Sequence, residues 1–353
     1  MPRLEPRPAP SRLWLWASPV LALAVTAALG ALLFALLGKD PARALAAFFW
    51  EPLGSTGALG ELGLKATPLL LIALGLALCF RAGVWNIGAE GQFILGSIAA
   101  SGVALLADGD TGRWIVLPIL LAGALGGMAW AGITALLRER FNASEILVSL
   151  MLVYVSVQLL GWLVYGPWKD PLGYNLPQTR MFAAATQIPR LIEGSRVNAG
   201  LPLALAGAAL LWLYLFRTRG GLALQVVGLA PAAARYAGFS ARGALWQALL
   251  VSGGAAGLAG ALEVAGPIGQ LTPAVPAGYG FAAIIVAFVG RLHPLGMLLS
   301  SVLLSMFTIG GELAQSRLGL PRSITGVFQG LLLLALLACD TLVNYRIRFG
   351  RSV

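Results

Sequence analysis

The amino-acid sequence predicts an all-α membrane protein with about ten transmembrane helices. Of its 353 residues, 58% are hydrophobic and only 11% are charged, about half the charged share of an ordinary soluble domain. The apolar residues lie in runs close to the roughly 20 residues that a helix needs to cross a bilayer. The basic residues behind the net charge of +10 lie at the ends of these runs, as in loops beside a membrane. They form no patch that would follow a nucleic-acid backbone.

The individual spans follow from the apolar runs. The first run comes after three arginines and is too long for the core of a signal peptide, so we expect a retained span. The eighth is short and bracketed by Gly278, Gly280 and Gly290, which suggests a half-span or re-entrant segment. The ten expected spans are 13–37, 62–80, 88–107, 114–137, 144–165, 200–216, 243–264, 279–291, 294–312 and 324–341.

The arginine distribution predicts the orientation. With the amino terminus inside, 14 basic residues fall in the inner short loops and tails and six in the outer short loops, so both termini are expected to be cytoplasmic. The chain then divides into a cytoplasmic tail (1–12), a transmembrane permease domain (13–341) and a second cytoplasmic tail (342–353). Loop 166–199 is expected outside and loop 217–243 in the cytoplasm.

Several classes of function lack their motifs. There is no glycine loop ending in Gly-Lys-Ser/Thr, no His-Glu-x-x-His and no Cys-x-x-Cys pattern. Cys79 and Cys339 lie far apart in apolar runs and behave as small hydrophobes, and His293 lies in a short turn. We therefore expect a non-enzymatic chain with no metal and no cofactor.

A polar interruption stands between the apolar runs 69–79 and 94–106. It contains Asn86, Glu90 and Gln92, and a charge at bilayer depth costs roughly 2.5–3.5 kcal/mol. On a helix the first two would share a face. Two interpretations stay open: these side chains line a path for a polar solute, or they hydrogen-bond neighbouring helices.

Three further residues near the expected spans invite the same question. Tyr279 and Phe281 either stack on a ring of the solute or pack against other helices. Glu263 is a second intramembrane carboxylate, interpreted as a structural partner or a gate near the outer face.

The cytoplasmic loop contains a short predicted helix. Pro231 suits a first helical turn and Gly238 suits a stop, with alanines between them. The helix is either an inert interfacial element or a docking helix for a cytoplasmic partner.

Four segments together resemble the permease subunits of ATP-binding-cassette importers in the branched-chain amino acid/ribose superfamily. The similarity is greatest to the nucleoside branch, which is served by basic-membrane-protein-type lipoprotein receptors. Its most specific string is Asn86–Gln92. Trp85 replaces the family's more frequent phenylalanine and keeps an aromatic side chain. The four segments are 67–92, 166–179, 235–238 and 278–291.

This resemblance implies an importer-permease fold in the inner (plasma) membrane of a bacterial-type cell, moving nucleosides inward by alternating access. It implies three partners: a second, homologous permease in a heterodimer, a cytoplasmic ATP-binding subunit and an extracytoplasmic substrate-binding lipoprotein. The predicted substrate pathway comprises Asn86, Glu90, Gln92, Tyr279 and Phe281. The predicted ATPase contact comprises Pro231, Arg235, Tyr236, Ala237 and Gly238.

Three alternatives stay open. The same machinery can import a sugar or a branched-chain amino acid. A proton-coupled secondary transporter would use Glu90 and Glu263 as proton carriers. A membrane-bound assembly subunit would show no dependence on any solute.

Overall fold

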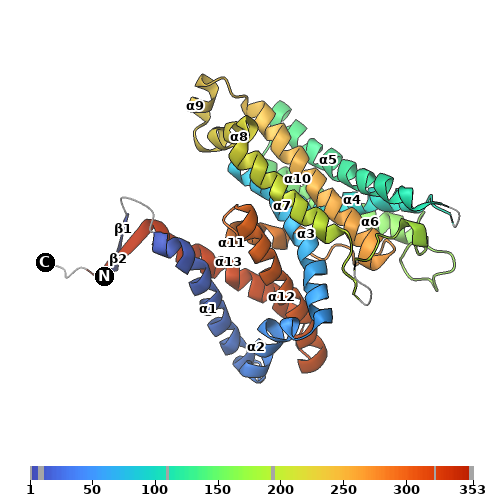
Figure 1. Cartoon of the computed structure of the whole chain (residues 1–353), viewed down its shortest axis with the longest axis horizontal. Helices are drawn as coiled ribbons and strands as arrows, with labels where there is room; N and C mark the ends of the chain where they lie inside the picture. Colours follow the sequence, from blue (N-terminus) through green and yellow to red (C-terminus); the bar gives the residue numbers. More distant parts are fainter. Residues whose placement is uncertain (1, 7–11, 109–110, 192–194, 322, 350–353) are drawn as a thin grey trace. The chain divides into compact units, whose positions relative to one another are not determined.

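The structure is a computed structural model that describes residues 2–6, 12–108, 111–191, 195–321 and 323–349 (Figure 1). Within these ranges the chain is almost wholly helical. The helices are α1 (Arg12–Leu36), α2 (Pro41–Phe49), α3 (Thr56–Arg81), α4 (Ala89–Ala104), α5 (Val116–Phe141), α6 (Glu145–Tyr165), α7 (Gly200–Arg217), α8 (Arg219–Leu229), α9 (Pro231–Tyr236), α10 (Ala241–Glu263), α11 (Tyr279–Val289), α12 (Pro294–Leu318) and α13 (Ser323–Asn344). Two strands, β1 (Pro2–Pro6) and β2 (Tyr345–Phe349), complete the described secondary structure, apart from single helical turns.

Each of the ten predicted spans coincides with a helix, and the predicted all-α polytopic fold is confirmed. In the described part of the chain, eight helices are long and apolar enough to cross a membrane. The two predicted spans outside this set are α4, with 16 residues, and α11, with 11. Helix α4 is short because residues 84–87 ahead of it are not helical. Helix α11 has the length expected of a half-span.

The first of two compact units contains residues 1–62 and 303–353. Phe34, Phe48, Phe307 and Phe328 are fully buried at its centre, with the rings of Phe48 and Phe328 stacked at 4.6 Å between centroids. Strands β1 and β2 pair antiparallel, Pro2 opposite Phe349. The two ends of the described chain therefore lie side by side. The expected tails, 1–12 and 342–353, lie partly outside the described residues. Within their described parts, residues 2–6 and 345–349 form these strands, whereas Arg12 begins α1 and residues 342–344 end α13.

The second unit, residues 63–302, is built around α4. Twelve of its 16 residues are buried, and α5 and α10 lie beside it (Figure 1). Glycines allow this approach: a Cβ added to Gly257 would lie 2.2 Å from the Gly123 carbonyl oxygen, and one added to Gly96 would lie 2.2 Å from the Gly257 Cα. Small residues at such crossings bring helix backbones into contact within membranes.

An irregular segment connects α10 with α11, and the predicted exterior loop covers it. Thr179 and Leu271 exchange two hydrogen bonds of 3.0 Å each, from the Thr179 amide to the Leu271 carbonyl and from the Leu271 amide to the Thr179 hydroxyl. The Phe182 amide donates to the Gly269 carbonyl at 2.8 Å, and the Ile188 amide to the Ala265 carbonyl at 3.0 Å. The loop thus satisfies backbone groups that no helix satisfies.

Candidate transport site and cytoplasmic arm

The two amides of the polar interruption face each other. The Asn86 Nδ2 donates to the Gln92 Oε1 at 3.0 Å, and the Gln92 Nε2 donates to the Asn86 Oδ1 at 3.1 Å. The Asn86 Nδ2 also donates to the Ser252 hydroxyl of α10 at 3.0 Å. Asn86 and Gln92 are 0% and 1% exposed, so this contact is made inside the subunit. It holds the non-helical segment before α4 against α10.

Glu90 holds the amino-terminal end of α11. Its Oε1 accepts the Gly278 amide at 2.9 Å, and its Oε2 accepts the Gly280 amide at 2.5 Å. A Cβ added to Gly280 would lie 2.2 Å from the Glu90 nitrogen, so the first turns of the two helices are in contact. A carboxylate at this end also complements the positive end of the helix dipole.

The two predicted aromatic residues of α11 differ in exposure. Tyr279 is 4% exposed and meets Phe93 edge-to-face, with ring centroids 5.8 Å apart. Phe281 is 43% exposed. The structure therefore brings Glu90 and Tyr279 together inside the subunit and leaves Phe281 on its surface.

An aromatic cluster that the sequence reasoning missed lies at the other end of α11. Phe80, Trp85 and Phe288 pack with centroid separations of 5.0 to 6.2 Å, and Trp85 is 45% exposed. The sequence held a signal for Phe288 only, because it follows Phe281 by seven residues and so shares its helix face. We refer to Phe80, Trp85 and Phe288 as the aromatic cluster.

Arg81, the last residue of α3, joins three segments that are far apart in the sequence. Its Nε and Nη2 donate to the Leu292 carbonyl at 3.1 and 2.9 Å, and its Nη1 donates to the Gln225 Oε1 at 2.9 Å. The guanidinium also lies over the Phe216 ring, 5.5 Å from its centroid. Leu292 belongs to the turn after α11, and Gln225 to α8. Sequence reasoning placed Arg81 in a cytoplasmic turn but not in this junction.

Helix α11 is consequently held by opposite charges at its two ends. The Glu90 carboxylate binds its amino-terminal backbone, and the Arg81 guanidinium binds the carbonyl of the turn that follows it. Each charge has the sign that the helix dipole favours at that end. Charge-assisted hydrogen bonds are roughly twice as strong as neutral ones, so these two contacts fix the position of α11 within the second unit.

Helices α8 and α9 form an exposed arm, defined as residues 219–236. Ala234 is buried against Val227 of α8 and Ala244 of α10, whereas Tyr236 is 98% exposed. Gly238 has a φ of +80° and ends the arm, as expected from the sequence. All five residues of the predicted ATPase contact are exposed: Pro231, Arg235, Tyr236, Ala237 and Gly238.

The predicted pathway and the predicted ATPase contact thus form separate groups of residues, and the Arg81–Gln225 hydrogen bond joins the end of α3 to α8 of the arm. Glu263, at the end of α10, lies within electrostatic range of Lys65 and Arg196. No group of three or more histidine, cysteine, aspartate or glutamate side chains suitable for a metal occurs among the described residues.

Comparisons with known proteins bear on the whole chain. Residues 59–337 match the family described as branched-chain amino acid transport system / permease component. Glucose ABC transporter permease protein TsgB13 of Haloferax volcanii is 33% identical, over 98% of this chain and 93% of that protein. Guanosine ABC transporter permease protein NupP of Bacillus subtilis is 29% identical, over 94% of each chain. Nucleoside ABC transporter permease protein NupB of Lactococcus lactis is 27% identical, over 88% of this chain and 87% of that protein.

These relatives confirm the predicted type of protein. The chain is a non-catalytic, multi-pass subunit of an ABC importer in the inner membrane. This type of subunit works with an ATPase and a substrate-binding protein. The matched residues cover more than half of the sequence, and the chain belongs to the branched-chain amino acid transport system / permease component family.

Proposed function

We propose that this chain is the permease subunit of an ATP-driven nucleoside importer that works by alternating access. The observation that carries the proposal is the continuous contact from the exposed arm to α11 through Gln225, Arg81 and Leu292. Two of the relatives named above are guanosine or nucleoside permeases. Exposed aromatic side chains suit a cargo that carries a base, because rings stack on one another.

In this proposal the arm receives the movement of the ATPase. Tyr236 and Arg235 project from the arm, while Ala234 packs onto α8 and α10. A displacement of α8 shifts Gln225, which holds the Arg81 guanidinium. Arg81 in turn holds the turn that follows α11, so α11 moves with the arm. At its amino-terminal end, α11 is bonded to Glu90 of α4, so the movement reaches α4 as well.

We assign different tasks to the predicted pathway residues. Phe281 and the aromatic cluster face the cargo at a surface shared with a second permease. We assign a supporting role to Asn86, Glu90 and Gln92, which hold the helices that carry these aromatic side chains. Their polar groups form hydrogen bonds within the chain. Direct contact of these three side chains with cargo stays the alternative prediction. The arrangement we propose is a heterodimer with an ATP-binding subunit at the arm and a lipoprotein receptor at loop 166–199.

The test is uptake by the reconstituted complex. We expect ATP-dependent accumulation of labelled guanosine, and Tyr236→Ala should reduce it while Tyr154→Ala should not. Both tyrosines are exposed, Tyr236 to 98% and Tyr154 to 63%, but Tyr154 belongs to α6 and lies outside both the arm and loop 166–199. Equal uptake by both variants would contradict the role of the arm. Uptake that survives ATP depletion would contradict ATP-driven import.

A sugar is the second candidate cargo. The relative at 33% identity is named a glucose permease, and ribose in a nucleoside presents hydroxyls as glucose does. Competition separates the two: unlabelled glucose in excess should leave guanosine uptake unchanged if the cargo is a nucleoside. Inhibition by glucose together with transport of labelled glucose would establish the sugar instead.

A further inference from the structure

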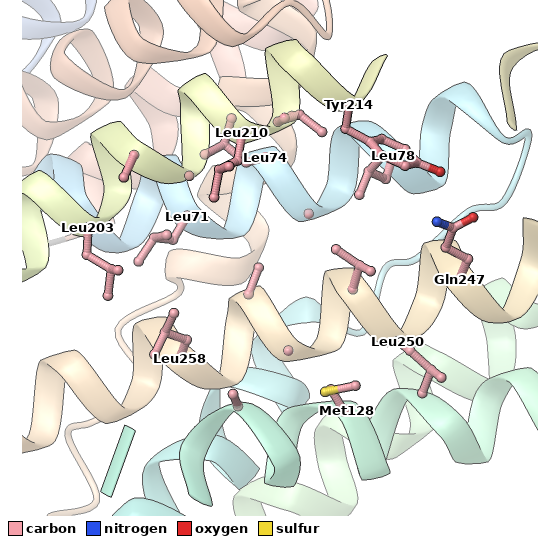
Figure 2. Close-up of a pocket in the computed structure, with 18 residues that line it drawn as sticks. Leu71, Leu74, Leu78, Met128, Leu203, Leu210, Tyr214, Gln247, Leu250 and Leu258 are labelled. Carbon is pink, nitrogen blue, oxygen red and sulfur yellow. The ribbon is translucent and has the colours of Figure 1, made fainter. Parts of the chain in front are cut away.

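A long apolar groove opens on the second unit, away from the candidate transport site. Helices α7 and α3 line one side of it, and helices α10 and α5 line the other (Figure 2). Its volume is about 530 Å³, within the range of pockets that hold small molecules. Leu210 and Val251 on its rim are 65% and 44% exposed. The aliphatic lining has polar groups at one end, where Figure 2 shows Tyr214 opposite Gln247.

Helix α7, which lines the groove, is largely uncovered by the rest of the chain. Only 22% of its residues are buried inside the chain. From Leu203 to Tyr214 the groove follows α7 for roughly 16 Å at the normal helical rise, about half of the hydrocarbon thickness of a bilayer. Its length therefore matches one leaflet, whereas a spanning helix of a partner would need a groove about twice as long.

The polar end of the groove carries positive charge. The α7 residues that line the groove recur every three or four positions up to Tyr214. Arg217 follows Tyr214 by three positions and so lies on the same helix face, one turn further on. Helix α8 begins here: a Cβ added to Gly220 would lie 2.9 Å from the Tyr214 hydroxyl, and its amino terminus adds positive potential. No ion pair of Arg217 or Arg219 occurs among the described residues, whereas Arg242 pairs with Glu139 at 2.8 Å.

Aromatic residues lie beside the polar end of the groove. Trp212 and Phe216 are 38% and 43% exposed, and the Arg217 guanidinium lies 5.5 Å from the centroid of the Trp212 ring. Tryptophan and arginine in this combination are typical of a membrane–water interface. The arginine distribution assigns this interface to the cytoplasmic side, where the leaflet is rich in anionic lipids.

We infer that this groove binds one acyl chain of an anionic phospholipid of the inner leaflet. The chain lies along the leucines of α7 and α10, and the phosphate meets Arg217 and Arg219 at the polar end. A site of this kind holds α7 and α10 together at the end where α8 begins. It is independent of the cargo and of the proposed transport function.

Native mass spectrometry of the full-length chain tests this inference, with phosphatidylglycerol and phosphatidylcholine as probes. We expect one retained phosphatidylglycerol per chain. Ala206→Phe fills the groove and should abolish retention, whereas Ala209→Phe, on an exposed part of α7 outside the lining, should not. Arg217→Gln should weaken retention about fivefold, and Arg140→Gln, an exposed arginine outside the groove, should leave it unchanged.

Because a bulky variant can misfold, a second measurement uses the unmodified chain. Phosphatidylglycerol with a photoreactive group on its acyl chain should cross-link to Leu210 or Val251. Cross-links confined to other helices, equal retention of phosphatidylcholine, or full retention by Ala206→Phe would each overturn the inference. So would loss of a partner subunit from Ala206→Phe with lipid retention unchanged, since the groove would then be a protein interface.

Discussion

Replacing Glu90 by glutamine tests whether a carboxylate anchors α11. The substitution keeps the size of the side chain but removes its charge and turns one oxygen into an NH₂ donor. At present one oxygen accepts the Gly278 amide at 2.9 Å and the other accepts the Gly280 amide at 2.5 Å. Glutamine can accept only one of these amides and presents a donor to the other.

The expected cost follows from these two contacts. A hydrogen bond to a charged group contributes about 1.5–3 kcal/mol, and a charge at a helix end roughly 0.3–2 kcal/mol. One neutral hydrogen bond of about 1 kcal/mol is retained. With two such bonds lost and one neutral bond retained, the free-energy cost of detaching the amino terminus of α11 should fall by about 2–7 kcal/mol. The detached population should therefore rise at least roughly 30-fold.

Hydrogen exchange of the full-length chain in lipid nanodiscs measures this population. We expect faster exchange in peptides that contain Gly278 and Gly280, and unchanged exchange in α5. Glu263→Gln is the control, because it removes a carboxylate from the end of α10 and leaves α11 untouched. Unchanged exchange in Glu90→Gln would refute the reasoning. Normal uptake of nucleoside by that variant, with ATPase activity intact, would further exclude Glu90 from the transport pathway.

Three other predictions concern the remaining contacts. Arg81→Met removes the three hydrogen bonds of the junction, so reconstituted complexes should keep their ATPase activity while uptake falls roughly 10- to 100-fold; proportional loss of both would argue against a transmission role. Asn86→Ala and Gln92→Ala should show a coupling energy of about 1–2 kcal/mol in a double-mutant cycle of unfolding, and additive effects would contradict the amide pair. Gly257→Ala should lower thermal stability by about 1–3 kcal/mol, since its Cβ would lie 2.2 Å from the Gly123 carbonyl. Gly161→Ala, with nothing within 4 Å, is its control and should cost nothing.

Much of the fold could be predicted because hydrophobic runs of span length have few alternatives in a membrane. All ten runs became helices. The short runs were harder to assign, since helix length depends on where the backbone is interrupted. Residues 84–87 delay the start of α4, and glycines on both sides limit α11. Hydrophobicity alone does not distinguish a short helix from a full span.

The site could be predicted only in part. Asn86, Glu90 and Gln92 were identifiable because polar residues at bilayer depth are costly, but their partners were not. Glu90 binds backbone amides of glycines, which carry no side chain to indicate the contact. The Arg81 junction joins residues separated by 144 and 211 positions, and no local pattern encodes such a distance.

The irregular segment between α10 and α11, which loop 166–199 covers, has a consequence for the order in which the protein is synthesised and folds. Its backbone groups bond to Thr179, Phe182 and Ile188, and α11 itself begins at the Glu90 carboxylate. All of these partners come earlier in the chain, so the ribosome supplies them before residues 264–280 emerge. An unpaired backbone group in hydrocarbon costs several kilocalories per mole, and this order of synthesis lets the half-helix enter a bundle that is ready to bind it. A circular permutant that begins after the loop at 166–199 would reverse the order and should insert α11 poorly.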